Sequence, residues 1–195
     1  MAEIDRLHWE DRYTSGHAPV HAAPNRWLAA QAPYLQLLED GGAAPLQALD
    51  VACGAGGTLL WLAARGWSVT GVDISAAALA LAQHQLAAAG LLDHAILIEA
   101  DLDAWRPLAA SCDLLTCFNF LDRRLWPSLR AAVRPQGLIC FSTYHRGRLI
   151  ERPHTNPDHL LAPGELAALV TDWGWRLLAR QHNERSEAVL AQRTV

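Results

Sequence analysis

The chain has 195 residues, enough for one folded domain with a substantial core. A composition of 51% hydrophobic and 18% charged residues excludes an intrinsically disordered protein. All 16 basic residues are arginine and the formal net charge is -4, so the chain as a whole has no general electrostatic attraction to nucleic acid.

The cysteines and the N-terminal segment bear on the cellular compartment. Cys53, Cys112, Cys117 and Cys140 include no CxxC pair and lie in largely apolar stretches, which is typical of reduced, buried thiols. The N-terminal segment MAEIDRLHWEDRY is charged and lacks the apolar region of a signal peptide. Because no stretch has the roughly 18 unbroken apolar residues of a membrane span, we expect a soluble cytoplasmic protein that does not bind membranes.

Residues 1–45 are expected to form a helical lid or cap region of a single domain. Trp9 and Tyr13 are spaced i and i+4, so they fall on one face of an N-terminal helix. This face either closes over a ligand pocket or packs into the core, and the spacing is compatible with both. Trp9 and Tyr13 are therefore candidate substrate-binding residues.

Residues 46–143 alternate between apolar runs and segments with helical spacing. A parallel, Rossmann-like sheet covered by helices on both faces is expected from this order. Helix 76–90 has a capping serine, Ser75, and helix 123–135 is interrupted or restarted near Pro127. The predicted strands are 46–52, 67–74, 94–102, 112–121 and 137–144, and the remaining predicted helix is 58–66.

After Tyr144 the pattern changes. Residues 145–164 are polar, basic and proline-bearing, and this length is typical of a functional loop. A helix is predicted over 165–174, and two alternating runs around NERSE predict a closing antiparallel hairpin. Residues 144–195 are thus expected to supply a substrate loop, a helix and the hairpin.

The segment QALDVACGAGG combines a strand with a glycine loop. Gly54 and Gly56 form G-x-G, but Leu59 stands where the dinucleotide fingerprint has its third glycine, and a P-loop needs a lysine that the chain lacks. Asp50 at the strand end is expected to point toward the pocket, where a carboxylate disfavours a pyrophosphate and favours a cation. These features indicate a phosphate-free cationic ligand.

With these residues the sequence resembles the class I S-adenosylmethionine-dependent methyltransferases. Their first motif, [D/E]-x-G-x-G-x-G, is matched by DVACGAG with Ala52 at the first glycine position. An alanine there indicates that residue 52 need not take a positive φ. In this family a parallel sheet ends in a C-terminal antiparallel hairpin, as predicted here.

The resemblance implies a cofactor site built from the ends of successive strands. It places the backbone of Gly54 and Gly56 against the methionine moiety of S-adenosylmethionine and the carboxylate of Asp73 on the two ribose hydroxyls. It places Ile74 on the adenine face, Asp101 as acceptor for the adenine amino group, and the Leu102 amide beside it. It also places Phe118 and Asn119, which follow the fourth strand, along the sulfonium end of the cofactor.

Each of these carboxylates also has a purely structural interpretation. Asp50 could cap the loop, Asp73 could precede a helix that Ser75 caps, and Asp101 could begin an Asx turn.

A narrower resemblance concerns the substrate. The segments HWEDRY, PNRWL and NPDHLLAPGEL are similar to those of the bacterial tellurite-resistance-type small-molecule methyltransferases, which include thiol and chalcogen-oxyanion methylators. This resemblance implies a small acceptor and does not identify it. The sequence is compatible with a monomer or a homodimer.

The acceptor side is expected just past the fifth strand. Tyr144, His145 and His154 are candidate general bases, although an oxyanion or thiolate acceptor needs none. Arg146 is a candidate substrate-binding residue because it lies with Arg148 and Arg152 in a locally basic stretch.

No metal ion is expected. His17 and His21 flank Pro19 and so do not share a helix face, and two nitrogen ligands are too few for a metal site.

The sequence thus predicts methyl transfer from S-adenosylmethionine to a small molecule by in-line displacement, with S-adenosylhomocysteine as product. The alternatives are an NAD-dependent oxidoreductase, which Leu59 and the hairpin disfavour, and a cofactor-binding protein with a sensor or partner role.

Overall fold

The computed structural model describes residues 2–18, 20, 22–41 and 45–194. The chain divides into two compact units, residues 1–106 and 107–195, each of which has its own part of the sheet.

The first unit contains three parallel strands in the order β3-β2-β1. The strands pair in register, from Gln47 with Ser68 in β1 and β2 to Asp73 with Glu99 in β2 and β3. Asp73 therefore lies at the carboxyl end of its strand, where ligands bind in open α/β sheets. The elements are α1 (Ala2–Thr14), α2 (Arg26–Ala30), α3 (Ala32–Gly41), β1 (Gln47–Val51), α4 (Gly57–Ala63), β2 (Ser68–Asp73), α5 (Ala76–Ala88), a 3₁₀ turn (Leu92–His94) and β3 (Ala95–Glu99).

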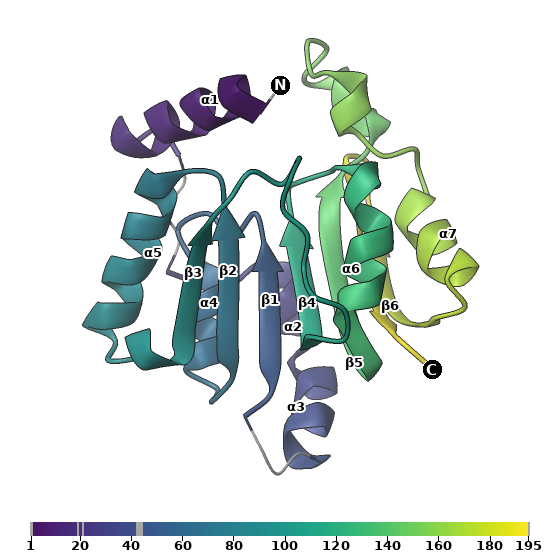
Figure 1. The fold of residues 1–195 in the computed structure, drawn as a ribbon. Coiled ribbons are helices and arrows are strands. Elements are labelled where there is room, and N and C mark those ends of the chain that lie inside the picture. The colour runs from purple at the N-terminus through teal and green to yellow at the C-terminus, as the bar shows by residue number, and fades with distance from the viewer. Residues whose placement is uncertain (1, 19, 21, 42–44, 195) are drawn as a thin grey trace. The chain divides into compact units, whose positions relative to one another are not determined.

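Helices α4 and α5 contact each other and β2, and α1 lies across the N-terminal end of α5 (Figure 1). As predicted, Ser75 is the N-cap of α5, since its hydroxyl oxygen accepts a hydrogen bond of 3.1 Å from the amide of Ala78. Ala78, Ala82 and Leu86 are buried on one face of α5, which is rich in alanine and leucine. This packing fixes the start of α5 close to the carboxyl ends of the strands.

The second unit contains four strands in the order β4-β5-β7-β6. β4 and β5 are parallel, whereas β7 is antiparallel to both β5 and β6, which confirms the predicted closing hairpin. Helix α6 packs on β4 and β5, and α7 packs on β6 and β7. The elements are β4 (Cys112–Phe118), α6 (Trp126–Ala132), β5 (Val133–Tyr144), α7 (Glu165–Asp172), β6 (Arg176–His182) and β7 (Ser186–Gln192), with 3₁₀ turns at Arg123–Leu125, Arg146–Ile150 and Pro157–His159.

The predicted helix 123–135 is wrong at both ends. Its first residues form a 3₁₀ turn, α6 runs from Trp126 to Ala132, and β5 already begins at Val133. Pro127 does not interrupt α6, because it lies in the first turn, where its missing N–H has no partner to lose. Pro135 disfavours a helical conformation at the preceding residue, which explains the early end of the helix.

Of the helices in the described part of the chain, none combines the length and the apolar character needed to cross a membrane.

Candidate active site

Three residues of the loop after β1 have a left-handed backbone conformation. Ala52, Gly54 and Gly56 have φ angles of 56°, 54° and 81°. The sequence did not require a positive φ at Ala52, but the structure has one there. The chain must turn sharply after β1 so that the Cys53 amide can donate to the carbonyl oxygen of Val72 in β2, at 3.1 Å. An L-residue in this conformation costs roughly 1–2 kcal/mol, which the fold sustains at this loop.

Both loop glycines are approached closely by other parts of the first unit. A Cβ built on Gly54 would lie 2.5 Å from the hydroxyl oxygen of Tyr13, and one on Gly56 would lie 2.6 Å from the Cβ of Ala82. The ring of Tyr13 thus brings α1 onto the glycine loop. Burial, together with the nearby charge of Asp73, raises the pKa of Tyr13 to about 12, so its hydroxyl is protonated at neutral pH.

Asp73 joins the glycine loop to the start of α5. Its Oδ2 accepts a hydrogen bond of 2.8 Å from the amide of Gly54, and its Oδ1 accepts one of 3.0 Å from the amide of Ser75. Burial raises the pKa of Asp73, whereas these two amides stabilise the charged form. Each carboxylate oxygen has a second lone pair, so both remain able to accept a bond from a ligand hydroxyl. The structural interpretation of Asp73 and its predicted ligand role are therefore compatible.

Glu10 is a residue of this region that sequence reasoning missed. From α1 its Oε2 accepts hydrogen bonds from the hydroxyl of Ser75, at 2.7 Å, and from the amide of Ala77, at 3.1 Å. These bonds, with that of Ser75 the stronger influence, lower the pKa of Glu10. Glu10 therefore fastens α1 to the N-terminus of α5, where a negative charge is favourable. The sequence singled out the neighbouring Trp9 and Tyr13 by their i and i+4 spacing, but no sequence pattern indicated a bonding partner for Glu10.

Removing the Glu10 carboxylate is expected to loosen α1. In Glu10→Ala, amide exchange across residues 2–14, followed by mass spectrometry, should become about threefold to tenfold faster, and Glu10→Gln should show a smaller change because its amide oxygen still accepts both bonds. The matched control is Glu3→Ala, because Glu3 bonds only to Arg6 in its own helix. Equal acceleration in Glu3→Ala and Glu10→Ala would contradict this assignment.

The same contact should depend on pH. Since the pKa of Glu10 is lower in the folded chain than in the unfolded one, its contribution is complete above the ordinary glutamate pKa of about 4.3 and is lost as the pH falls through the lowered value. Amide exchange of α1 corrected for intrinsic rates should therefore accelerate at acid pH in the unmodified chain, and Glu10→Gln should lack that step.

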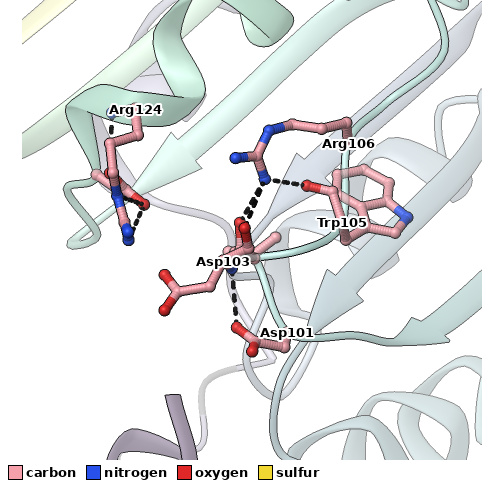
Figure 2. A network of polar contacts seen from close by, with 7 residues as sticks. Asp101, Asp103, Trp105, Arg106 and Arg124 are labelled. Carbon is pink, nitrogen blue, oxygen red and sulfur yellow. Dashed lines mark hydrogen bonds and ion pairs between the residues drawn. The ribbon is translucent and has the colours of Figure 1, made fainter. Parts of the chain in front are cut away.

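Asp101 begins an Asx turn after β3. Its Oδ1 accepts a hydrogen bond of 2.8 Å from the amide of Asp103, which is the structural alternative considered for it, and its Oδ2 stays outside that bond. Figure 2 shows the guanidinium of Arg106 turned back onto this segment. The Nη1 of Arg106 donates to the carbonyl oxygens of Leu102 and Trp105 at 2.8 and 2.7 Å. Arg106, which no motif singled out, thus holds the backbone of the turn that carries Asp101 and Leu102.

The other predicted cofactor residues of the first unit lie near these carboxylates in the sequence and differ in burial. Asp50, in β1, and Leu102 are buried, and Ile74 is half-buried directly after β2. The backbone places Asp50 next to Gly71 of β2 in the parallel register.

In the second unit, Phe118 and Asn119 end β4 at the carboxyl edge of the parallel pair β4 and β5. Asn119 has a φ of 56°, and its amide donates to the carbonyl oxygen of Ser142 at 2.8 Å. Asparagine adopts this left-handed conformation more readily than most other non-glycine residues. The side chain of Asn119 is exposed, and that of Phe118 is half-buried.

The three candidate bases differ in their surroundings. His145 is buried, with Nδ1 accepting from the amide of Gly147 at 2.9 Å and Nε2 lying 2.8 Å from the carbonyl oxygen of Asn183. Both of its ring nitrogens are thus occupied by backbone groups, which favours a structural role for His145. Tyr144 is half-buried and His154 is exposed, so these two residues remain accessible.

The comparisons with known proteins agree with this arrangement. Residues 48–137 match the family model described as a methyltransferase domain. A solved S-adenosylmethionine-dependent methyltransferase from Mesorhizobium loti superposes with a TM-score of 0.63 over 84% of this chain and 98% of its own, at 21% identity. A magnesium protoporphyrin IX methyltransferase from Synechocystis, solved with bound SAH, superposes with a TM-score of 0.69 over 99% of both chains, at 16% identity.

The chain has the class I methyltransferase fold. The parallel strand pairs and the C-terminal antiparallel hairpin are those predicted for this fold. Among curated proteins, the ubiquinone biosynthesis O-methyltransferase of Pseudomonas savastanoi pv. phaseolicola is 36% identical over 111 residues, which cover 54% of this chain. The chain spans about half the length of such relatives, 47% in this case.

Within the described part of the chain, no group of three or more His, Cys, Asp and Glu side chains is arranged to hold a metal ion. Of the segment considered as a metal site in the sequence, His21 and Pro19 lie outside the described residues.

Proposed function

We propose that the protein transfers the methyl group of S-adenosylmethionine to an oxygen atom of a small acceptor. The observation that carries this proposal is the position of Asp73, a carboxylate at the end of β2 that also orders the glycine loop through the Gly54 amide. The O-methyltransferase relatives support oxygen as the acceptor atom. The same comparisons favour S-adenosylmethionine over a nicotinamide dinucleotide.

The residues of the first unit suit this cofactor. Gly54 and Gly56 take the positive φ angles of the sharp loop after β1, which glycine adopts without steric cost. Asp73 retains lone pairs for the two ribose hydroxyls, and Asp101 retains Oδ2 for the adenine amino group. In the absence of lysine, no P-loop cradle for phosphates can form, whereas a carboxylate such as Asp50 favours a sulfonium cation.

When bound, S-adenosylmethionine supplies a methyl carbon that the acceptor oxygen attacks in line as the carbon–sulfur bond breaks, giving a methyl ether, S-adenosylhomocysteine and a proton. The chain's tasks are then alignment and exclusion of water. Tyr13, carried by α1 and held there through Glu10, covers the glycine loop at Gly54, and Trp9 lies beside Tyr13 on the same helix. Tyr144 and His154 are the accessible groups that could receive the acceptor proton. In this proposal the Phe118 and Asn119 pair lines the reacting centre.

In this proposal the three predicted segments of a single domain keep the roles expected from the sequence. Residues 1–45 act as the lid or cap, residues 46–143 bind the cofactor, and residues 144–195 supply the substrate loop, helix and hairpin. Thiols and chalcogen oxyanions such as tellurite are the second acceptor class, on the resemblance to the tellurite-resistance-type enzymes.

Release of S-adenosylhomocysteine from purified protein tests the activity. Catechols and small phenols, thiols, tellurite and selenite are offered separately with methyl-labelled S-adenosylmethionine, and mass spectrometry locates the label. We expect a labelled methyl ether from at least one phenol. Labelled thioether or methylated tellurium alone would move the acceptor to the second class, and cofactor binding without transfer to any acceptor would favour a sensor role.

A further inference from the structure

The segment between β5 and α7 is a compact loop whose two ends are tied together. At its base the amide of Arg146 donates to the carbonyl oxygen of Leu161 at 2.9 Å, and the amide of Leu161 donates to that of Tyr144 at 3.0 Å. Figure 1 shows this loop, residues 146–160, extending beyond the carboxyl end of β5. Such closed surface loops frequently carry binding functions.

A half-buried arginine, Arg123, holds the far side of the loop. Arg123 donates to the carbonyl oxygens of Asp158 and Leu160 at 3.1 and 3.0 Å. It also forms a bidentate pair with Glu165, with bonds of 2.6 and 2.8 Å. The backbone at the C-terminal end of the loop is therefore positioned by the β4–α6 connection and by the start of α7.

The loop presents positive charge in a chain of net negative charge. Arg146, Arg148 and Arg152 form no ion pair with any carboxylate among the described residues. Of the two acidic residues in the loop, Glu151 is already paired with Arg185 from the β6–β7 turn, with Nη1 and Oε2 3.0 Å apart. The excess positive charge of the loop is thus available to a ligand.

One of these arginines is oriented by an aromatic ring. The guanidinium carbon of Arg148 lies 3.5 Å from the centroid of the Tyr144 ring, which is van der Waals contact. Such stacking holds the cation through its face and leaves the N–H groups at its edge free for an oxyanion. In the same loop, Arg152 and His154 line a surface depression of about 350 Å³.

We propose that loop 146–160 binds an oxyanion group, a carboxylate or a phosphate, on the acceptor molecule, with Arg148 on the Tyr144 ring as its principal ligand. Arg146 and Arg152 supply further positive charge. This inference rests on the proposed function, since it names the class of its acceptor: a small phenol or related nucleophile that carries an acidic group. The loop lies at the carboxyl edge of β4 and β5, the same edge as Phe118 and Asn119.

Equilibrium titration with matched anionic and neutral probes tests the proposal. The pairs are 3,4-dihydroxybenzoate with its methyl ester, for a carboxylate, and phenyl phosphate with phenol, for a phosphate. Each is titrated into the protein with and without saturating S-adenosylhomocysteine. We expect the anion of at least one pair to bind at least about tenfold more tightly than its neutral partner, and the pair that shows it identifies the group.

The variants separate Arg148 from general charge. In Arg148→Gln the anion preference should fall below about threefold, and Arg148→Lys should give an intermediate value because it keeps the charge without the planar fork. The control is Arg176→Gln, which removes an exposed arginine at the start of β6, paired with Gln192 and hence at the opposite edge of the sheet from Tyr144. It should leave the preference unchanged.

Two outcomes would overturn the proposal: equal binding of anion and neutral partner in both pairs, or an anion preference that persists in Arg148→Gln. Either result leaves the methyltransferase function intact if S-adenosylhomocysteine binds in the same experiments. Failure of S-adenosylhomocysteine to bind would instead contradict the proposed function, whatever the probes do.

Discussion

Gly56→Ala is expected to lower the free energy of unfolding by about 2–4 kcal/mol. Gly56 has a φ of 81°, which an alanine adopts at a cost of roughly 1–2 kcal/mol. The new Cβ would also lie 2.6 Å from the Cβ and 3.1 Å from the Cα of Ala82, so α5 would have to move. Urea unfolding followed by circular dichroism measures the change.

Gly66→Ala is the matched control for this substitution. Gly66 has a similar φ of 88°, but no described atom lies within 4 Å of its added Cβ. It should therefore show only the backbone cost of roughly 1–2 kcal/mol. If Gly56→Ala destabilised the protein no more than Gly66→Ala, the close packing of the loop against α5 would be wrong.

Asp73→Asn is expected to weaken binding of S-adenosylhomocysteine by about 10- to 100-fold in isothermal titration. An asparagine has one carbonyl oxygen where Asp73 uses two oxygens to accept from the amides of Gly54 and Ser75. Its NH₂ group would face one of these donors, and the charge-assisted bonds to the cofactor, worth roughly 1.5–3 kcal/mol, would be lost. The loop would lose order and a ligand contact together.

The control for Asp73→Asn is Asp93→Asn, an exposed position in the 3₁₀ turn before β3, which should bind as the unmodified chain does. A melting curve of each variant separates lost binding from lost folding. Asp73→Asn with an unchanged affinity and melting temperature would show that Asp73 does not contact the cofactor.

Much of the fold could be predicted because local signals agreed with it. The glycines that follow β1 and α4, the capping Ser75 and the alternating runs around NERSE each specify a boundary through short-range chemistry. The bounds predicted for helix 123–135 were wrong because Pro127 marks the start of the helix rather than an interruption, and because Pro135 disfavours helix at the residue before it.

The candidate site was harder to predict from the sequence, because its decisive contacts join segments that are far apart in the chain. The bonds of Glu10 to Ser75 and Ala77 span more than sixty residues, and no periodicity reveals them. The positive φ of Ala52 follows from the pairing of Cys53 with Val72, which is a tertiary requirement that overrides the residue's own preference. His145 looked like an accessible base, but the folded backbone supplies partners to both its ring nitrogens.

Titration of the unmodified protein with S-adenosylhomocysteine and, separately, with NADH tests the central claim most directly. The account predicts stoichiometric binding of S-adenosylhomocysteine that weakens in Asp73→Asn, and no saturable binding of NADH. Saturable binding of NADH without any heat from S-adenosylhomocysteine would contradict it.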